Sequence, residues 1–153
     1  MVKSKTKKVI IISLLVVAAA ILVFFINGLT TPLPTAIPQD IVSGNITVKS
    51  SSYEYYNFTV PPNDNAQIYG NFSVNNASTI EVFILDEANF ARYQSKQTPN
   101  TIYSSGEQTA ANVTATLRVQ GTYYIVFDNS FSSSAKNVQA SITENIYRAQ
   151  LFR

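Results

Sequence analysis

The stretch "GTYYIVFDNSFSSSAKNVQASI", residues 121–142, decides the fold of this chain. Apolar side chains occupy both alternating sets of positions in residues 123–127, which predicts a strand that is covered on both faces. Apolar and polar residues alternate in residues 138–142, which predicts a second strand with one buried face. The stretch therefore indicates two strands joined by a polar loop.

The polar loop begins with Asp128 and Asn129 and continues with serines around Phe131. Asp, Asn and Ser side chains at a strand exit bond back to nearby backbone N–H groups, and we expect Phe131 to pack under the loop. These residues are thus predicted to form a structural corner of a β-sandwich. A binding surface at Asp128, Asn129 and Phe131 is the alternative. A reactive serine is disfavoured, because no base is at hand to activate it.

Alternation with a period of two recurs along the chain before this stretch. It appears around residues 46–48, 56–60, 68–74 and 113–119, while residues 79–86 are more uniformly apolar and are typical of a central strand. Residues 113–119 are expected to form a hairpin with residues 122–128. With no βαβ spacing, the pattern predicts an all-β fold, an antiparallel β-sandwich of about seven strands over residues 41–146.

Two segments interrupt the strand pattern. In "DEANFARYQSK", residues 86–96, Asp86 is expected to cap a short helix or turn with Phe90 and Tyr93 on one side. "SSG" at residues 104–106 is expected to be a turn.

The first 28 residues predict a membrane anchor. A basic tail, residues 1–8, precedes an uncharged run of 18 residues, Val9 to Ile26. As a helix this run spans about 27 Å, close to the bilayer core of about 30 Å. We therefore expect one N-terminal transmembrane signal-anchor helix, residues 9–28, in contact with the lipid bilayer. A cleaved signal peptide is the alternative, but neither the length nor the flanking residues favour it.

The four lysines of the basic tail place the N-terminus in the cytoplasm and the rest of the chain outside. The expected localisation is the cell membrane, with a single span and an extracytoplasmic C-terminal domain. Residues 29–40 carry three of the six prolines and predict an extended linker, and residues 147–153 are expected to be a C-terminal tail.

Composition excludes several classes of function. The chain has no Cys and no His, which removes thiolate nucleophiles, disulfides, imidazole bases and the usual zinc ligands. Residues 29–153 carry seven basic and nine acidic residues, so the basic footprint of a nucleic-acid-binding domain is absent. Asp64 and Asp128 lie in turns without a recognised calcium spacing, so no metal and no cofactor is expected.

Five Asn-x-Ser/Thr sequons are candidate glycosylation sites: Asn45, Asn57, Asn71, Asn76 and Asn112. In four of them the middle residue is apolar and is expected to face the core, which leaves the Asn side chain outside. A polar outer face would give the same pattern without any glycan. "YEYY", residues 53–56, has rings that could stack on sugars or a partner, and the favoured interpretation is that they fill core and edge positions.

Three segments carry a resemblance to a known family: "SSYEYYNFTVPPNDNAQIYGNFSV", "IEVFILDEANFARY" and residues 121–142. Their order over residues 41–146 resembles the GOLD (Golgi dynamics) domain and its prokaryotic relatives. The resemblance implies an extracytoplasmic β-sandwich that binds protein or has a structural role, without catalysis. The anchor stands at the N-terminus here, unlike in the cargo receptors of that family, so their sorting role does not carry over.

The predicted function is a membrane-anchored extracytoplasmic β-sandwich that serves as a non-catalytic protein-interaction or envelope-structural module. One alternative is an accessory subunit of a membrane transport or secretion complex. The other is a subunit of a surface filament, although "TKKVII" lacks the small residue that processing ahead of the helix requires. The sequence does not identify the protein partner.

Overall fold

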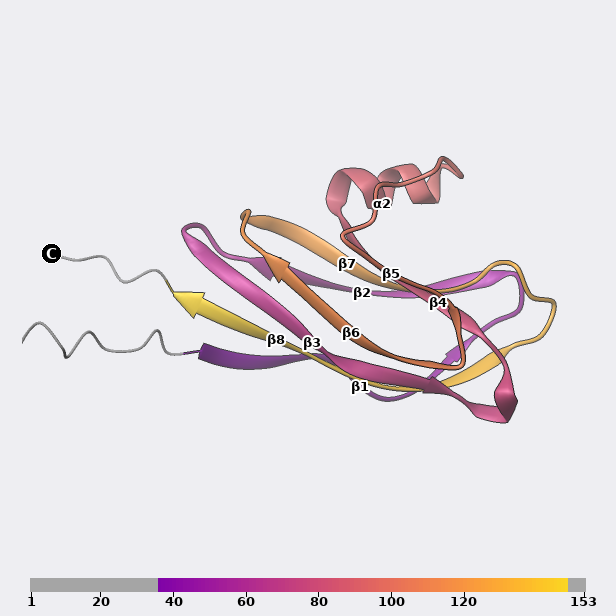
Figure 1. Ribbon diagram of the computed structural model, residues 1–153. Helices are drawn as coiled ribbons and strands as arrows, with labels where there is room; N and C mark the ends of the chain where they lie inside the picture. The colour runs from indigo at the N-terminus through magenta and orange to yellow at the C-terminus, as the bar shows by residue number, and fades with distance from the viewer. Residues whose placement is uncertain (1–35, 149–153) are drawn as a thin grey trace, which may run out of the picture. The chain divides into compact units, whose positions relative to one another are not determined.

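The computed structural model describes residues 36–148, which form a β-sandwich with one short helix on its outside (Figure 1). The elements in chain order are β1 (Ala36–Val48), β2 (Ser52–Val60), β3 (Asp64–Val74), the 3-10 turn η1 (Asn75–Ala77), β4 (Ile80–Asp86), α2 (Glu87–Gln94), β5 (Tyr103–Gln108), β6 (Ala110–Leu117), β7 (Gly121–Asn129) and β8 (Lys136–Arg148).

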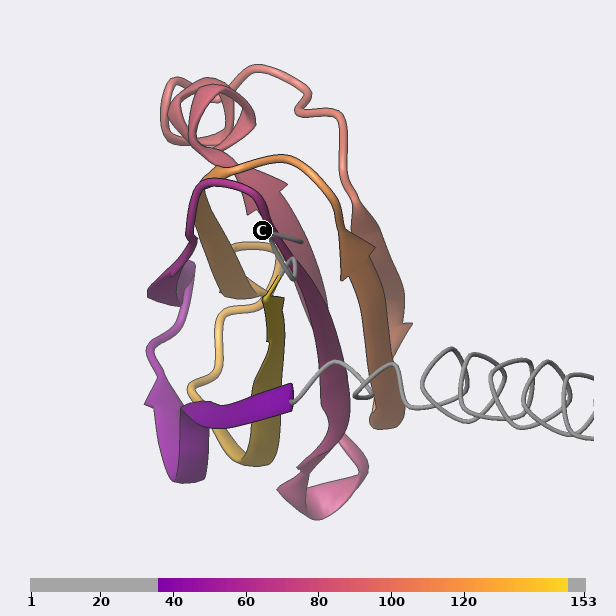
Figure 2. The same ribbon diagram turned by 90° about the vertical axis from the view of Figure 1, so that its left-hand side faces the viewer.

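The strands form two four-stranded antiparallel sheets. Sheet A has the order β1-β8-β3-β6, and sheet B has the order β2-β7-β4-β5. Figure 2 shows the two layers from one end. The predicted all-β antiparallel sandwich is confirmed over the described residues, with eight strands in place of about seven.

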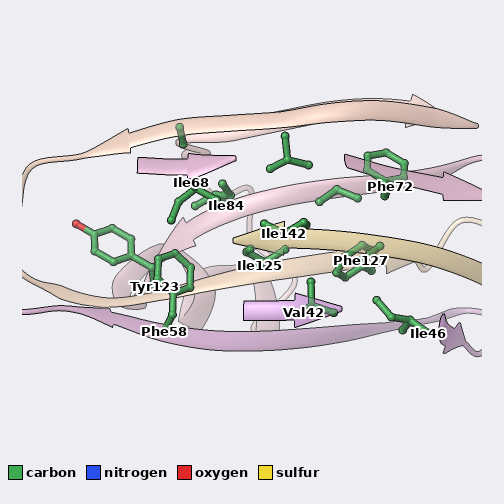
Figure 3. Close-up of a cluster of buried hydrophobic side chains, with 14 of the residues drawn as sticks. Val42, Ile46, Phe58, Ile68, Phe72, Ile84, Tyr123, Ile125, Phe127 and Ile142 are labelled. Carbon is green, nitrogen blue, oxygen red and sulfur yellow. The ribbon is translucent and has the colours of Figure 1, made fainter. Parts of the chain in front are cut away.

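The core lies between the sheets and is made by one alternating set of side chains from every strand except β5, of which only the partly buried Tyr103 packs against it (Figure 3). Ile68, Phe72 and Ile142 come from sheet A, while Ile125 and Phe127 come from sheet B, and all five are buried. Burial of such side chains stabilises each by roughly 1.5–3 kcal/mol. The period-two pattern of the sequence is thus the pattern of core-facing positions.

Strand β7 is covered on both faces, as its sequence predicts. Tyr123, Ile125 and Phe127 belong to the core between the sheets. Val126 and Tyr124 belong to a second apolar cluster on the outer face of sheet B, beneath α2. Since both sets of positions are apolar, a helix or a loop had to cover the outer face, and α2 covers it (Figure 1).

Helix α2 begins and docks as the sequence predicts. The Asp86 side chain is its N-cap and accepts a hydrogen bond from the Asn89 backbone N–H at 2.8 Å. Phe90 is buried and stacks on Tyr124, with ring centroids 4.0 Å apart and planes 11° apart. Tyr93 lies in the same apolar cluster. The helix is therefore held by a cap at its start and by aromatic packing along one side.

The sandwich begins earlier and ends later than predicted. Strand β1 starts at Ala36, inside the expected linker 29–40, and pairs with β8, where Ala36 lies opposite Tyr147. Strand β8 runs to Arg148, past the expected start of the tail at residue 147. Pro38 fits in β1 because β1 is an edge strand, where a missing N–H costs no ladder hydrogen bond.

The expected turn at residues 104–106 is wrong, because these residues lie within β5. The register of β4 against β5 shifts between Glu81 and Phe83, which marks a bulge, and Gly106 has a left-handed φ of 60°. The Ser105 hydroxyl accepts a hydrogen bond from the Val82 backbone N–H at 2.9 Å. A bulge at a sheet edge interrupts the alternation of apolar and polar residues, so no strand pattern is visible in the sequence of β5.

The expected hairpin between residues 113–119 and 122–128 is also wrong. Strand β6 pairs with β3 in sheet A, while β7 pairs with β2 and β4 in sheet B. The short connection around Gln120 and Gly121 therefore crosses from one sheet to the other. The loop after β7 crosses back, since β8 lies in sheet A.

Three predicted segments lie outside the described residues: the basic tail 1–8, the anchor helix 9–28 and residues 29–35 of the linker. Within residues 36–148, no helix has the length and apolar character that a membrane span requires.

Candidate ligand-binding groove

A groove of about 510 Å³ lies on the outer face of sheet B beside α2. Three aromatic side chains line it: Tyr53 of β2, Phe83 of β4 and Tyr93 of α2. Its rim is formed by the chain that follows the helix, including Lys96 and Gln97. Concave sites with aromatic walls and a few polar groups are the common form of ligand sites in proteins.

The sheet and the helix fix the three rings. Phe83 points outward because Val82 and Ile84 on either side of it face the core. The Tyr53 and Tyr93 ring centroids are 5.1 Å apart, and those of Phe83 and Tyr93 are 5.8 Å apart, both in edge-to-face geometry. Edge-to-face pairs are a favoured arrangement, so the rings are held in place before any ligand arrives.

Asp128 lies close enough to Tyr93 to act on its hydroxyl group. Asp128 is 7% exposed, and its charge acts on the Tyr93 phenol. Its carboxylate accepts hydrogen bonds from the Ser130 backbone N–H at 2.8 Å and from the Ser130 hydroxyl at 3.1 Å. Burial, and then the charge of Asp128, raise the pKa of Tyr93 well above its ordinary value, so this phenol stays protonated.

Asp128 is also part of a line of three carboxylates, here named the acidic row: Glu107, Glu81 and Asp128. Glu81 is the direct register partner of Glu107 on β5 and of Asp128 on β7. Neighbouring strands lie about 4.8 Å apart, and like charges placed directly opposite one another destabilise a sheet.

The acidic row is bonded to hydroxyl and backbone groups. Ser104 donates a hydrogen bond to Glu81 at 2.8 Å, and Thr79 donates one to Glu107 at 3.4 Å. No Lys or Arg side chain of residues 36–148 forms an ion pair with any of the three carboxylates. In the same part of the chain, no three acidic groups converge where they could hold a metal ion. The row is therefore a line of negative charge beside the groove.

Asn129 has the structural role that the sequence predicts for the loop after β7. It is fully buried, and its side-chain Nδ2 donates hydrogen bonds to the backbone carbonyls of Lys49 at 2.9 Å and Ser134 at 2.8 Å. These bonds connect the loop between β1 and β2, which holds Lys49, to the loop between β7 and β8, which holds Ser134. Its Oδ1 is buried without a hydrogen-bond partner.

The expectation for Phe131 is wrong, because this side chain is 44% exposed rather than packed under the loop. The Asn129 amide fills the inside of the corner and holds it by hydrogen bonds. No apolar pocket is needed there.

The sequon residues lie as their pattern predicts. All five asparagines (Asn45, Asn57, Asn71, Asn76 and Asn112) are exposed, and the four apolar middle residues (Ile46, Phe58, Phe72 and Val113) are buried. Asn71 and Asn112 are direct partners across β3 and β6. Glycosylation itself stays a prediction.

The sequence did not reveal the groove. The favoured prediction for "YEYY" is core and edge positions, and it fits: Tyr56 packs against the core, and Tyr53 packs against the outer apolar cluster from the edge strand β2. The sequence predicts Glu81 and Phe83 only as parts of a strand. Their outward direction was present in the alternation of residues 80–84, but their neighbours across the sheet depend on strand pairing, which the sequence does not show.

A second concavity of about 570 Å³ lies at one end of sheet A, between Gln67, Arg118, Tyr147 and Arg148. It is lined mainly by amide, hydroxyl and basic side chains, with Tyr147 as its one ring. The groove on sheet B is the stronger candidate because three rings in contact form its wall.

No protein-family model and no curated protein matches the sequence. Among solved structures, a protein of Bacillus endospore appendages, described as a novel family of disulfide-linked pili, is 9% identical with a TM-score of 0.47, over 78% of this chain and 95% of that chain. The CBM36-1 domain of a multidomain xylanase from the hindgut metagenome of Trinervitermes trinervoides is 13% identical with a TM-score of 0.41, over 76% of this chain and 100% of that chain.

The isomalto-dextranase of Arthrobacter globiformis T6, complexed with panose, is 11% identical with a TM-score of 0.38, and the match covers 74% of this chain and 23% of the enzyme. At these identities and TM-scores, we draw no functional conclusion from the likenesses.

Proposed function

We propose that this chain is a non-catalytic protein-interaction module, displayed outside the cell by its predicted N-terminal anchor. The groove beside α2 carries the proposal, because Tyr53, Phe83 and Tyr93 form an organised aromatic surface that is only partly buried. Aromatic side chains are enriched at the centres of protein interfaces, where rigid rings bury a large area at low entropic cost.

The absence of catalysis in this proposal rests on the chemistry at the groove. The chain has no Cys and no His. Ser130 lines the groove, and its bonds to Asp128 from both N–H and hydroxyl are those of a turn. The two bonds reach different oxygens of Asp128, so both of its oxygens are engaged in structural bonds.

A photo-cross-linking experiment tests the proposal. A photoreactive residue is placed at Gln97, on the groove rim, in the full-length chain expressed in its own cells. The matched control carries the same residue at Gln139, which is exposed on the outer face of sheet A. We expect a discrete protein adduct from position 97 that is absent from position 139 and weakened by Tyr53→Ala.

Equal adducts from both positions, or no protein adduct from position 97, would overturn the proposal. The identity of the adduct also separates the two alternatives for the partner. Transport or secretion proteins would indicate an accessory subunit, and cross-linking to a second copy of this chain would indicate a filament subunit.

A further inference from the structure

We propose that the groove receives a lysine or arginine side chain of the partner protein, with the three rings around the cation and the acidic row beside it. This inference rests on the proposed function and adds the chemistry by which the partner is recognised. It is argued from the rings, from the charge on sheet B and from the rim of the groove.

The aromatic rings of Tyr53, Phe83 and Tyr93 lie close to one another in the groove wall. Tyr93 contacts both Tyr53 and Phe83, with centroid distances of 5.1 Å and 5.8 Å. A cation within about 6 Å of a ring centroid is attracted by the electrons of the ring face, and the attraction grows when the site is desolvated. A side chain that enters this groove meets three such rings at once.

The acidic row supplies the complementary charge. Glu107, Glu81 and Asp128 lie side by side on three adjacent strands, and no cation of residues 36–148 pairs with them. Asp128 and Glu81 are both near enough to Tyr93 to perturb its phenol. The repulsion among the carboxylates is a cost of the free protein, and an incoming cation relieves it.

The cation that already lines the groove is Lys96, on the rim. It is exposed, and it follows the end of α2 with a left-handed φ of 58°. Its charge opposes a second cation, so removing it should tighten binding. A neutral sugar would stack on the same rings without using the acidic row, and the row therefore favours a basic side chain.

The test measures binding of short fluorescent peptides to the full-length chain in detergent micelles by anisotropy. The peptides are identical Gly/Ser sequences with one central Lys, Arg or norleucine. We expect the Lys and Arg peptides to bind about tenfold more tightly than the norleucine peptide, with the difference falling as salt is added. Glu81→Gln and Glu107→Gln should each weaken Lys binding several-fold, and Lys96→Gln should strengthen it.

Glu87→Gln is the matched control, because it removes one negative charge at an exposed position of α2 outside the groove lining. It should leave the preference for Lys unchanged. The melting temperature of each variant is measured, so that loss of fold is separated from loss of binding. Asp128 is not used, because it also holds the turn at Ser130.

Equal affinity for the Lys and norleucine peptides would overturn the inference, as would an effect of Glu87→Gln as large as that of Glu81→Gln. Binding of neutral oligosaccharides that depends on Tyr53, with no preference for Lys, would also overturn it and would indicate a glycan ligand. If the Gln97 cross-link forms while the Lys preference is absent, only this inference fails. If the cross-link is also absent, the proposed function fails with it.

Discussion

Replacing Glu144 by Gln should make the sandwich more stable at neutral and alkaline pH. Glu144 lies on β8 and shares the core-facing side of the strand with Ala140 and Ile142. It is 1% exposed, and its Oε1 has no hydrogen-bond partner. Burial raises the pKa of this carboxyl from 4.5 to about 7. A carboxylate in this position is therefore costly.

The sign and the size of the effect follow from that pKa. A raised pKa means that the folded state binds the proton more tightly than the unfolded state, so stability falls as pH rises. The loss begins near the ordinary pKa of 4.5 and is complete a little above pH 7. A difference of about 2.5 pKa units corresponds to about 3 kcal/mol. Gln is neutral at every pH and has nearly the shape of the protonated Glu144 side chain.

The measurement is the free energy of unfolding in urea, followed by circular dichroism at a series of pH values. We expect the parent and the Glu144→Gln variant to agree within about 1 kcal/mol near pH 4, and the variant to be more stable by about 2–3 kcal/mol near pH 8. Gln139→Ala, at an exposed position of the same strand and without a titratable group, is the control and should not change the pH slope. A parent stability that is flat across this range, or a Glu144→Gln variant with the parent's slope, would refute the reasoning.

Three further substitutions, one of them with Gly44→Ala as its control, test other parts of the structure by thermal melting. Asn129→Ala removes two hydrogen bonds from a buried corner and should lower the free energy of unfolding by about 2 kcal/mol or more. A change under about 0.5 kcal/mol would contradict the structural role of Asn129 in this corner. Gly70→Ala should prevent folding or lower the free energy of unfolding by more than about 3 kcal/mol, because the added Cβ would collide with the Ser141 carbonyl oxygen. At Gly44 the added Cβ meets open space, so Gly44→Ala should cost only backbone strain. Phe131→Ala should change stability by less than about 1 kcal/mol, since this ring is half exposed, and a larger loss would restore the packing role that the sequence suggested.

The sequence by itself determined the local structure. The period-two alternation, the apolar run of residues 123–127 and the cap at Asp86 each depend on neighbours within a few positions, and each was confirmed. The apolar set that faces the sandwich core is visible in the printed letters because side chains alternate strictly between the two faces of a strand.

Only the tertiary structure decided which strands lie side by side. The sequence suggested a hairpin of residues 113–119 with residues 122–128, yet these strands belong to different sheets. The bulge in β5 hid an edge strand, and the acidic row exists only because β4 lies between β5 and β7. Likewise, the alternation of β8 places Glu144 on the core-facing side, but only the packing of the sheets leaves its Oε1 buried without a hydrogen-bond partner. Strand pairing joins residues far apart in sequence, so local periodicity specifies which face a residue occupies but not which residues share that face with it.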